Sequence, residues 1–308
     1  MTARSAGSSV SVRAPAKINL HLGVGPVRPD GYHPLATAYQ AISLFSTVTA
    51  TEADGWSLTC SGRDGVVVDD VPLDDTNLAM RAARLLAGHA GRDRPGDPGV
   101  ALHLDKGIPV AGGLAGGSAD AAAALLACDA LWGLGTPLSE LLALAGRLGS
   151  DVPFGLLGGS AAGHGRGELV TALADAGRYD WVVLTRDAGM STPAVYAEYD
   201  ALHAGSVVPD PEIPAALVDA LAAGSVRDLA AAVGNDLQPA SLRLRPELGA
   251  PLEAGLAASA LAALVSGSGP TCLFLCEDGP HAEQVAAALA PYGRTVLAHG
   301  PVPGAEVI

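Results

Sequence analysis

The chain has 308 residues, about twice the size of an average domain, so two domains are expected. Hydrophobic residues make up 49% and charged residues 16% of the chain, which is enough for a large buried core and excludes a disordered chain. The net charge of −14 argues against nucleic acids and anionic membranes as partners, because both require a basic surface.

No apolar run reaches the roughly 18 residues that a membrane-spanning helix needs, since the richest stretch, 121–134, is interrupted by Asp129. The first nine residues are small and polar and lack the apolar segment of a secretory signal. We therefore expect a cytoplasmic protein. The cysteines form neither a CxxC pair nor a Cys/His metal spacing, so zinc and redox chemistry are not indicated.

The first predicted strand covers residues 10–24. From position 17 onward, apolar residues alternate with Lys17, Asn19 and His21, which indicates a half-buried strand with one polar face. Lys17 and Lys106 are the two lysines of a chain that uses arginine elsewhere, and this usage favours a specific need for lysine at both positions. A loop rich in glycine and proline follows at 25–34.

The remaining elements follow from periodicity and turn residues. The sequence predicts strands at 42–50, 56–60, 100–104, 181–186, 262–265, 271–276 and 295–299. It predicts helices at 78–89 (capped by Asp75), 118–132, 138–148, 192–203, 214–223, 226–233, 246–258 and 281–289. Strands and helices do not alternate strictly, which favours the α+β class in both halves. We place the domain boundary in the glycine-rich run, giving domains 1–165 and 166–308.

The densest glycine cluster, PVAGGLAGGSA, spans 109–119 and leads directly into a predicted helix. Glycines let backbone N–H groups approach a ligand, and a helix N-terminus favours anions, so the segment is typical of a phosphate-binding loop. It is not a Walker A motif, because Ser118 stands where the lysine is required, and Ala111 breaks the dinucleotide fingerprint. A plain loop or a close helix-packing patch is the alternative.

Other residues have a possible chemical role and an ordinary structural one. Lys17 and Asn19 can present a charge and an amide to a substrate, or can belong to a solvated strand face. Asp151 can act as a general base or as the N-cap of a helix begun by the following proline. Tyr32 and His33 can stack on and hydrogen-bond a base, or can be ordinary loop residues.

A second close-approach turn lies at 266–271 (SGSGPT). It is not a nucleophile elbow, which needs GxSxG, so a hydrolase is not indicated. In order along the chain, the segments 14–20 (APAKINL), 109–119 and 266–271 resemble the motifs of the galactokinase, homoserine kinase, mevalonate kinase and phosphomevalonate kinase (GHMP) family. The resemblance covers nearly the whole chain, apart from the first nine residues and the region 205–230.

Within that family, the stretches 28–33 (RPDGYH) and 148–154 (LGSDVPF) are similar to the branch that phosphorylates the 2-hydroxyl of a cytidine diphosphate methylerythritol, in the non-mevalonate route to isoprenoids. The segments 75–78 (DTNL) and 235–237 (NDL) match as well. The resemblance implies a ribosomal-protein-S5-like N-terminal domain and a ferredoxin-like C-terminal domain, with the active site in the cleft between them.

The resemblance also implies roles for single residues. Lys17 and Asp151 correspond to the catalytic pair, and ATP with Mg²⁺ is the expected donor, although no protein ligand of the metal can be named. The ATP-binding residues would be Pro109, Val110, Ala111, Gly112, Gly113, Leu114, Ala115, Gly116, Gly117, Ser118, Ala119 and Asn77. The substrate-binding residues would be Asn19, Tyr32, His33, Thr192 and Tyr196. Ala115 departs from the pattern, since many relatives have glycine there.

Two alternatives remain at this level. One is another GHMP-family kinase that acts on homoserine or a mevalonate-type alcohol, against which Tyr32 and His33 argue if they contact a cytosine. The other is a non-catalytic nucleotide-binding protein on the same fold, against which the presence of both Lys17 and Asp151 argues. The expected partners are small molecules, and the chain is expected to be a monomer or a homodimer.

Overall fold

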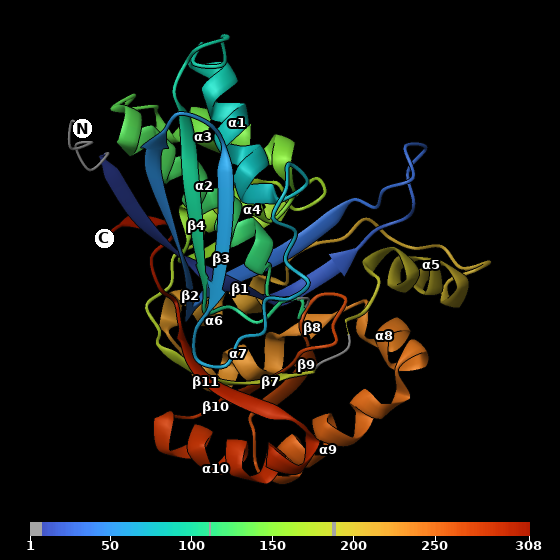
Figure 1. Cartoon of the computed structure of the whole chain (residues 1–308). Coiled ribbons are helices and arrows are strands. Elements are labelled where there is room, and N and C mark those ends of the chain that lie inside the picture. Colours follow the sequence, from blue (N-terminus) through green and yellow to red (C-terminus); the bar gives the residue numbers. More distant parts are fainter. Residues whose placement is uncertain (1–7, 111, 187–188) are drawn as a thin grey trace.

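Two β-sheets, stacked one above the other and flanked by helices, form the molecule (Figure 1). The computed structural model describes residues 8–110, 112–186 and 189–308. In this part of the chain the large sheet has the strand order β12-β1-β2-β4-β3, while β5 pairs with β2 and β6, and β8 pairs with β1. Its strands are β1 (Ser9–Val24), β2 (Leu35–Ala53), β3 (Ser57–Gly62), β4 (Gly99–Lys106), β5 (Ser160–His164), β6 (Leu169–Ala172), β8 (Gly234–Asn235) and β12 (Glu306–Val307).

Helices cover one face of the large sheet. They are α1 (Leu78–His89), α2 (Gly116–Trp132), α3 (Leu138–Leu148) and α4 (Val152–Leu157). The alanine-rich α2 packs directly on β1 and β2, and most of its alanines are buried: Ala119, Ala121, Ala122, Ala123, Ala124 and Ala127. Because alanine lets a helix approach a sheet closely, the N-terminus of α2 is fixed above the polar face of β1.

The small sheet has the order β11-β7-β10-β9 and is antiparallel throughout. Its strands are β7 (Tyr179–Thr185), β9 (Ala262–Val265), β10 (Cys272–Cys276) and β11 (Arg294–Gly300). The helices of this half are α5 (Thr192–Leu202), α6 (Ala215–Ala223), α7 (Val226–Ala232), α8 (Gln238–Leu244), α9 (Gly249–Ala257) and α10 (Gly279–Leu289), with short 3₁₀ turns η1 (Pro246–Leu248) and η2 (Ala290–Tyr292).

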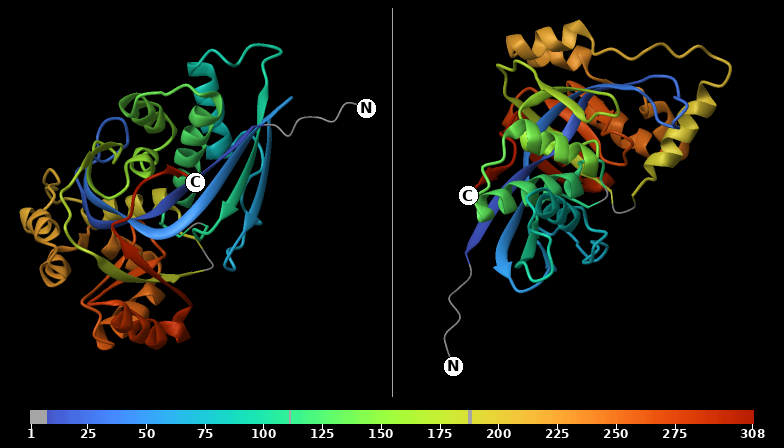
Figure 2. Two further views of the ribbon diagram at one scale, coloured as in Figure 1. Left: turned by 90° about the vertical axis from the view of Figure 1, so that its left-hand side faces the viewer. Right: turned by 90° about the horizontal axis from the view of Figure 1, so that it is seen from above.

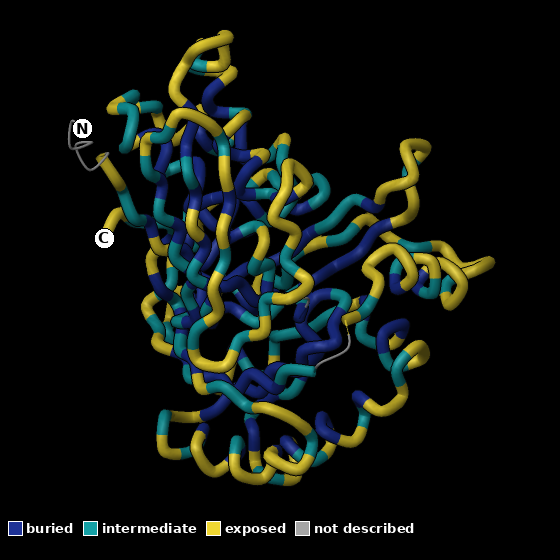
Figure 3. The backbone as a smooth tube through the Cα atoms, viewed as in Figure 1, coloured by how far each residue is buried: buried dark blue, intermediate teal, exposed yellow. Residues whose placement is uncertain are grey.

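Both faces of the small sheet are buried. Trp181 and Val183 of β7 join the main hydrophobic core, whereas Val182 and Leu184 pack on the opposite side with α9 and α10. The outer sides of α9 and α10 are exposed to solvent, while buried backbone runs through both sheets (Figure 3). No helix in the described part of the chain has both the length and the apolar character to cross a membrane.

The sequence predictions hold for most of the long elements. Helices 78–89 and 138–148 and strand 262–265 have the predicted bounds. Helix α8 and the short strands β5, β6, β8 and β12 were not predicted, because segments of two to seven residues carry little periodicity. The predicted half-buried strand is also wrong in one respect: both faces of β1 are buried, and Lys17 and Asn19 are 8% and 3% exposed.

The predicted cap of α1 is wrong by two residues. Asn77, not Asp75, is the N-cap, and its side-chain oxygen accepts the N–H of Ala79 at 2.9 Å. Asp75 is exposed and forms an ion pair with Arg84 of the same helix. Both Asn and Asp are good caps, so local composition alone does not distinguish them.

The division between the sheets lies further along the chain than residue 165. β5 and β6 form a hairpin within the large sheet, so the predicted boundary falls in the turn that joins them. The chain enters the small sheet at β7, after residue 172. Two short strands from the second half, β8 and β12, return to the large sheet beside β1.

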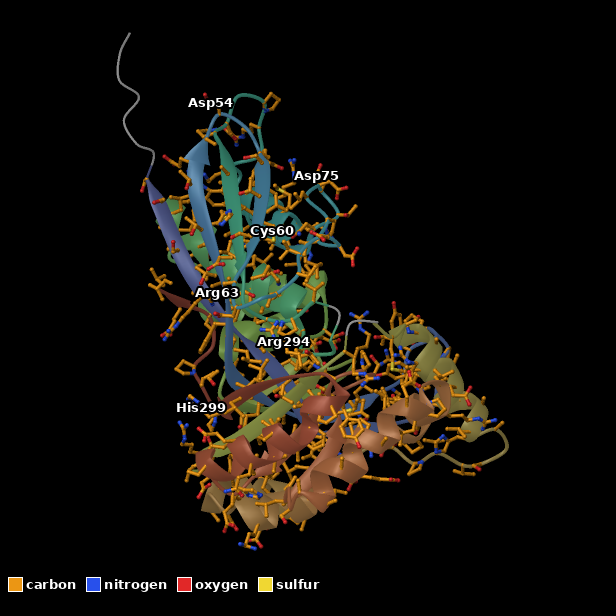
Figure 4. The ribbon with its side chains drawn as sticks, turned by 60° about the horizontal axis from the view of Figure 1, so that its bottom comes forward. Asp54, Cys60, Arg63, Asp75, Arg294 and His299 are labelled. Atoms are coloured by element: carbon orange, nitrogen blue, oxygen red, sulfur yellow. The ribbon has the colours of Figure 1, made fainter. Side chains whose placement is uncertain are left out.

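Polar side chains tie the two sheets together. Arg294 of β11 donates to the backbone carbonyls of Asp64 and Gly65 in the loop after β3 (Figure 4). Inside the molecule, Gln40 of β2 accepts the indole N–H of Trp181 at 3.0 Å and donates to Asp175 at 3.2 Å. These bonds fix the position of the large sheet relative to the small one, and therefore also the relative positions of the loops and helices attached to the two sheets.

We expect Gln40→Ala to lower the free energy of unfolding by about 2–4 kcal/mol, because it leaves the N–H of the buried Trp181 without its acceptor and removes one of the donors to Asp175. Chemical denaturation followed by tryptophan fluorescence measures the change. Gln284→Ala, at an exposed position of α10, is the control and should stay within about 0.5 kcal/mol of the unchanged protein. Equal effects of the two substitutions would contradict this account of Gln40.

Candidate active site

A hollow of about 760 Å³ lies between the polar face of β1, the N-terminus of α2 and helix α5. The loop between β1 and β2 lies beside α5 (Figure 1, Figure 2). Residues 31–33 of this loop line one end of the hollow. The turn between β5 and β6, the start of α4 and the turn after β9 complete its wall. Three segments that are far apart in sequence therefore meet here: the first strand, the glycine loop and the turn at 266–268.

Lys17 and Asp151 face each other in this hollow, with Nζ 3.6 Å from Oδ2. The Lys17 ammonium also donates to Oδ1 of Asn19 at 2.7 Å, and the Asn19 amide donates to the Thr37 hydroxyl at 2.8 Å. Side chains two residues apart on a strand share a face, so the alternation of β1 puts Lys17 beside Asn19. The hydrogen bonds from Lys17 to Asn19 and from Asn19 to Thr37 hold the ammonium of Lys17 toward Asp151.

Asp151 occupies the N-cap position of α4 but does not cap the helix, since its side chain makes no hydrogen bond to the helix backbone. Its Oδ1 accepts the hydroxyl of Tyr39 at 3.2 Å instead. Burial, and then the neighbouring Asp151 carboxylate, raise the pKa of the Tyr39 hydroxyl well above its usual value, so it remains a donor. The carboxylate is held by the site, and the cap interpretation of Asp151 is wrong.

The glycine loop turns its backbone toward the same hollow. Gly112, Gly113, Ala115, Gly116 and Gly117 line it, and α2 begins at Gly116. Gly113 and Ala115 both have positive φ, +77° and +56°, so the alanine that departs from the family pattern adopts the left-handed conformation that a glycine would. The loop has the geometry of an anion site, with free N–H groups at a helix N-terminus.

Other residues of the predicted ATP segment take different places. Leu114 and Ala119 are buried in the core, Val110 lines a second hollow, and Pro109 and Ser118 are partly buried without lining either hollow. Ala111 lies outside the described residues.

The second hollow, of about 210 Å³, lies on the other side of the glycine loop and shares Gly116 and Gly117 with the first. Asn77 and Lys106 line it. Lys106 donates to the carbonyl of Gly116 at 3.2 Å and forms a buried ion pair of 2.5 Å with Asp120. Burial raises the pKa of the Asp120 carboxyl, and the ammonium of Lys106 opposes that rise. Lys17 therefore lines the large hollow, and Lys106 lines the second hollow and contacts the glycine loop.

The opposite end of the large hollow is aromatic. Tyr32 is 54% exposed, and the ring of His33 is buried and stacks on Tyr196 with centroids 5.2 Å apart. Nδ1 of His33 donates to the carbonyl of Gly25 at 2.8 Å, and Nε2 lies 3.5 Å from the Asp200 carboxylate. The His33 ring is therefore fixed by the protein itself, while the Tyr32 ring is exposed and has the Arg166 guanidinium 5.1 Å from its centroid.

Thr192, at the first turn of α5, also lines the hollow, and its hydroxyl is 2.9 Å from that of Ser268. Every residue predicted from the sequence as catalytic or substrate-binding lies in one hollow. Sequence reasoning missed further lining residues that single positions do not signal. These are Leu22, Leu35, Tyr39, Arg166, Pro193, Ala197 and Asp200. Ser150, Leu237, Gly267 and Ser268 also line the hollow; they belong to segments that the sequence singled out without giving these residues a role.

Family models match both halves of the chain: "GHMP kinases N terminal domain" at residues 77–159 and "GHMP kinases C terminal" at 217–294. The 4-diphosphocytidyl-2-C-methyl-D-erythritol kinase of Thermobifida fusca is 56% identical, over 99% of this chain and all of the relative. The enzyme of the same name from Streptomyces coelicolor is 54% identical, over 97% of this chain and 99% of the relative.

Solved structures agree. A crystal structure of 4-(cytidine 5'-diphospho)-2C-methyl-D-erythritol kinase superimposes with a TM-score of 0.75 at 36% identity, covering 94% of this chain and 98% of that one. A homoserine kinase from Cytophaga hutchinsonii, at 19% identity and a TM-score of 0.70 over the full length of both chains, shares the fold. The two-sheet α+β architecture is therefore the GHMP kinase fold, and the chain belongs to the GHMP kinases, in the group formed by the 4-diphosphocytidyl-2-C-methyl-D-erythritol kinases.

Proposed function

We propose that the protein transfers the γ-phosphoryl group of ATP to the 2-hydroxyl of 4-diphosphocytidyl-2-C-methyl-D-erythritol, giving the 2-phosphate and ADP. The observation that carries the proposal is the Lys17–Asp151 pair, which lies in one hollow with an anion-binding loop and an aromatic wall. Relatives above 50% identity over nearly the whole chain bear the name of this activity.

Asp151 is the group that accepts or orients the proton of the attacking hydroxyl. The ammonium of Lys17 lies 3.6 Å from this carboxylate and neutralises negative charge on the phosphoryl group during its transfer. Such charge stabilisation is the main contribution that a protein makes to phosphoryl transfer. Tyr39 and Asn19 hold the two charged groups in place, one bond each. A binding protein would need no such base, which favours the enzyme over a non-catalytic nucleotide binder.

The glycine loop binds the phosphates of ATP through its N–H groups and the start of α2. The second hollow, which contains Asn77 and adjoins the same glycines, would accept the remainder of the nucleotide. In the described residues no group of three or more His, Cys, Asp or Glu side chains could hold a metal ion. Mg²⁺ would bind the ATP phosphates, as is usual for this ion, and would lower the charge of the triphosphate.

The aromatic end of the hollow would hold the cytosine. Tyr32 offers an exposed ring for stacking, and Tyr196, supported by His33, lies on the wall formed by α5. An alcohol such as homoserine has no ring to fill this end, so the aromatic wall favours a nucleoside-linked substrate over the other alcohols of the family. A cytoplasmic location, where ATP is available, is part of the proposal.

We expect Asp151→Asn to lower kcat by about 10²–10⁴, with KM for both substrates within about tenfold, because the carboxylate acts in the transition state. Steady-state kinetics with an ATP-coupled assay measure both constants. Asp219→Asn makes the same change at an exposed position of α6 outside the hollow and should leave kcat within about threefold. Near-normal kcat in Asp151→Asn would exclude this residue as the base.

We expect Gly113→Ala to raise KM for ATP about tenfold or more. A Cβ there would lie 2.6 Å from the Ser266 carbonyl oxygen, and φ of +77° resists a side chain, so the loop must shift. The reverse change, Ala115→Gly, is the matched control and should leave KM for ATP within about threefold, since glycine adopts the same φ freely. Equal KM values for both variants and the unchanged enzyme would remove this loop from the ATP site.

We expect Tyr32→Ala to raise KM for the cytidyl substrate about tenfold with little effect on KM for ATP, because stacking on an aromatic ring contributes about 1–3 kcal/mol per base. Val27→Ala, at an exposed position of the same loop outside the hollow, is the control. A Tyr32→Ala enzyme that saturates with the cytidyl substrate like the control would show that this ring does not contact the base.

A further inference from the structure

Arg166 lies at the tip of the β5–β6 turn and lines the large hollow. The turn is fitted closely against the site: the carbonyl of Gly165 accepts the N–H of Leu35 at 2.8 Å, and Gly167 has φ of +103°. A Cβ on Gly167 would lie 2.3 Å from the hydroxyl of Tyr39, so the turn approaches the site as closely as the backbone allows. The position of Arg166 is thus set by the same contacts that position the catalytic groups.

The guanidinium of Arg166 has one long ion pair and a contact with an aromatic ring. Its carbon lies 5.1 Å from the centroid of the Tyr32 ring, a cation–π distance. Its Nε is 3.7 Å from Oε1 of Glu168, a long ion pair, whereas the other Glu168 oxygen accepts the backbone N–H of Arg166 at 2.6 Å. Among the residues that the structure describes, the two terminal nitrogens of Arg166 have no hydrogen-bond partner.

The charged side chains of the hollow indicate which part of the substrate Arg166 can bind. Among its described lining residues, Lys17 and Arg166 are the permanent cations, and Asp151 and Asp200 carry the carboxylates. Lys17 is engaged with Asn19 and Asp151, where the phosphoryl group is transferred. A substrate with a diphosphate brings one negative charge per phosphate, and these charges need a donor outside the transfer site. Arginine suits this group, because its planar fork binds two phosphate oxygens at once.

We propose that Arg166 binds the diphosphate that links the nucleoside to the sugar alcohol, while its contact with Tyr32 keeps that ring in place for the base. This inference rests on the proposed function, since it takes a nucleoside diphosphate as the substrate class. It adds a specificity-determining residue: a free nucleoside or an uncharged alcohol would gain nothing from Arg166, whereas a nucleoside diphosphate would.

The test compares two ligands and three variants by competitive inhibition of the kinase reaction, with calorimetry as a second measurement. CDP carries the base and the diphosphate, and cytidine carries the base alone. Arg166→Gln removes the charge, Arg166→Lys keeps a cation over Tyr32 but loses the fork, and Arg227→Gln makes the same charge change at an exposed ion pair with Glu277 on the other half of the chain. Thermal unfolding of each variant checks the fold.

We expect Arg166→Gln to weaken CDP about tenfold to a hundredfold, and Arg166→Lys to weaken it less. Cytidine should bind Arg166→Lys as it binds the unchanged enzyme, and KM for ATP should not move in any variant. Equal losses of CDP and cytidine in Arg166→Lys would overturn the inference, because Arg166 would then act on the base or on Tyr32 alone. Unchanged CDP affinity in Arg166→Gln would overturn it as well.

Failure of the proposed function would look different. In that case the unchanged enzyme would neither bind CDP nor phosphorylate the cytidyl alcohol, before any variant is compared, and this inference would fall with it. If the unchanged enzyme binds CDP and Arg166→Gln binds it equally well, the function stands and only the role of Arg166 is wrong.

Discussion

An ammonium and a carboxylate, Lys17 and Asp151, must stay 3.6 Å apart without closing into a direct, mutually satisfied pair. Each is therefore held from its far side, Lys17 by Asn19 and Asp151 by Tyr39. Three of these residues come from adjacent strands β1 and β2, and the fourth from the start of α4, which packs under α2. The large sheet and its alanine-rich helix are what keep that separation constant.

The acidic character of the chain makes the placement of positive charge the second constraint. A protein with a net charge of −14 that binds two phosphorylated substrates needs local positive potential at the site. Most surface arginines of the described chain are paired with carboxylates, as Arg13 is with Glu306 and Arg84 with Asp75. The positive potential in the hollow comes from Lys17 and Arg166, whose ion pairs of 3.6 and 3.7 Å are long, and from the uncharged N–H groups at the start of α2.

The two halves of the chain also need each other at the site. The turn at 266–268 belongs to the second half, yet it lines the hollow beside the glycine loop, and Ser266 donates to the carbonyl of Gly113. The side chain of Asn235 holds this turn through the carbonyls of Val265 and Gly267. Gln40 and Arg294 join the two sheets at other points, so the halves of the chain are bonded to each other both at the glycine loop and away from it.

The sequence by itself determined the long elements, the anion-binding loop and the polar face of the first strand, because periodicity, glycine spacing and alternation are local properties. It left Asp151 open between a cap and a base, and the tertiary structure excluded the cap, because the carboxylate contacts Tyr39 and Lys17 and makes no bond to the helix backbone. It also left Ala115 open, and the left-handed φ there is set by the fold around the loop. Tyr39 and Arg166 gave no signal, since their roles arise from distances across the fold to residues such as Asp151, 112 positions away from Tyr39, and a single sequence records no such distance.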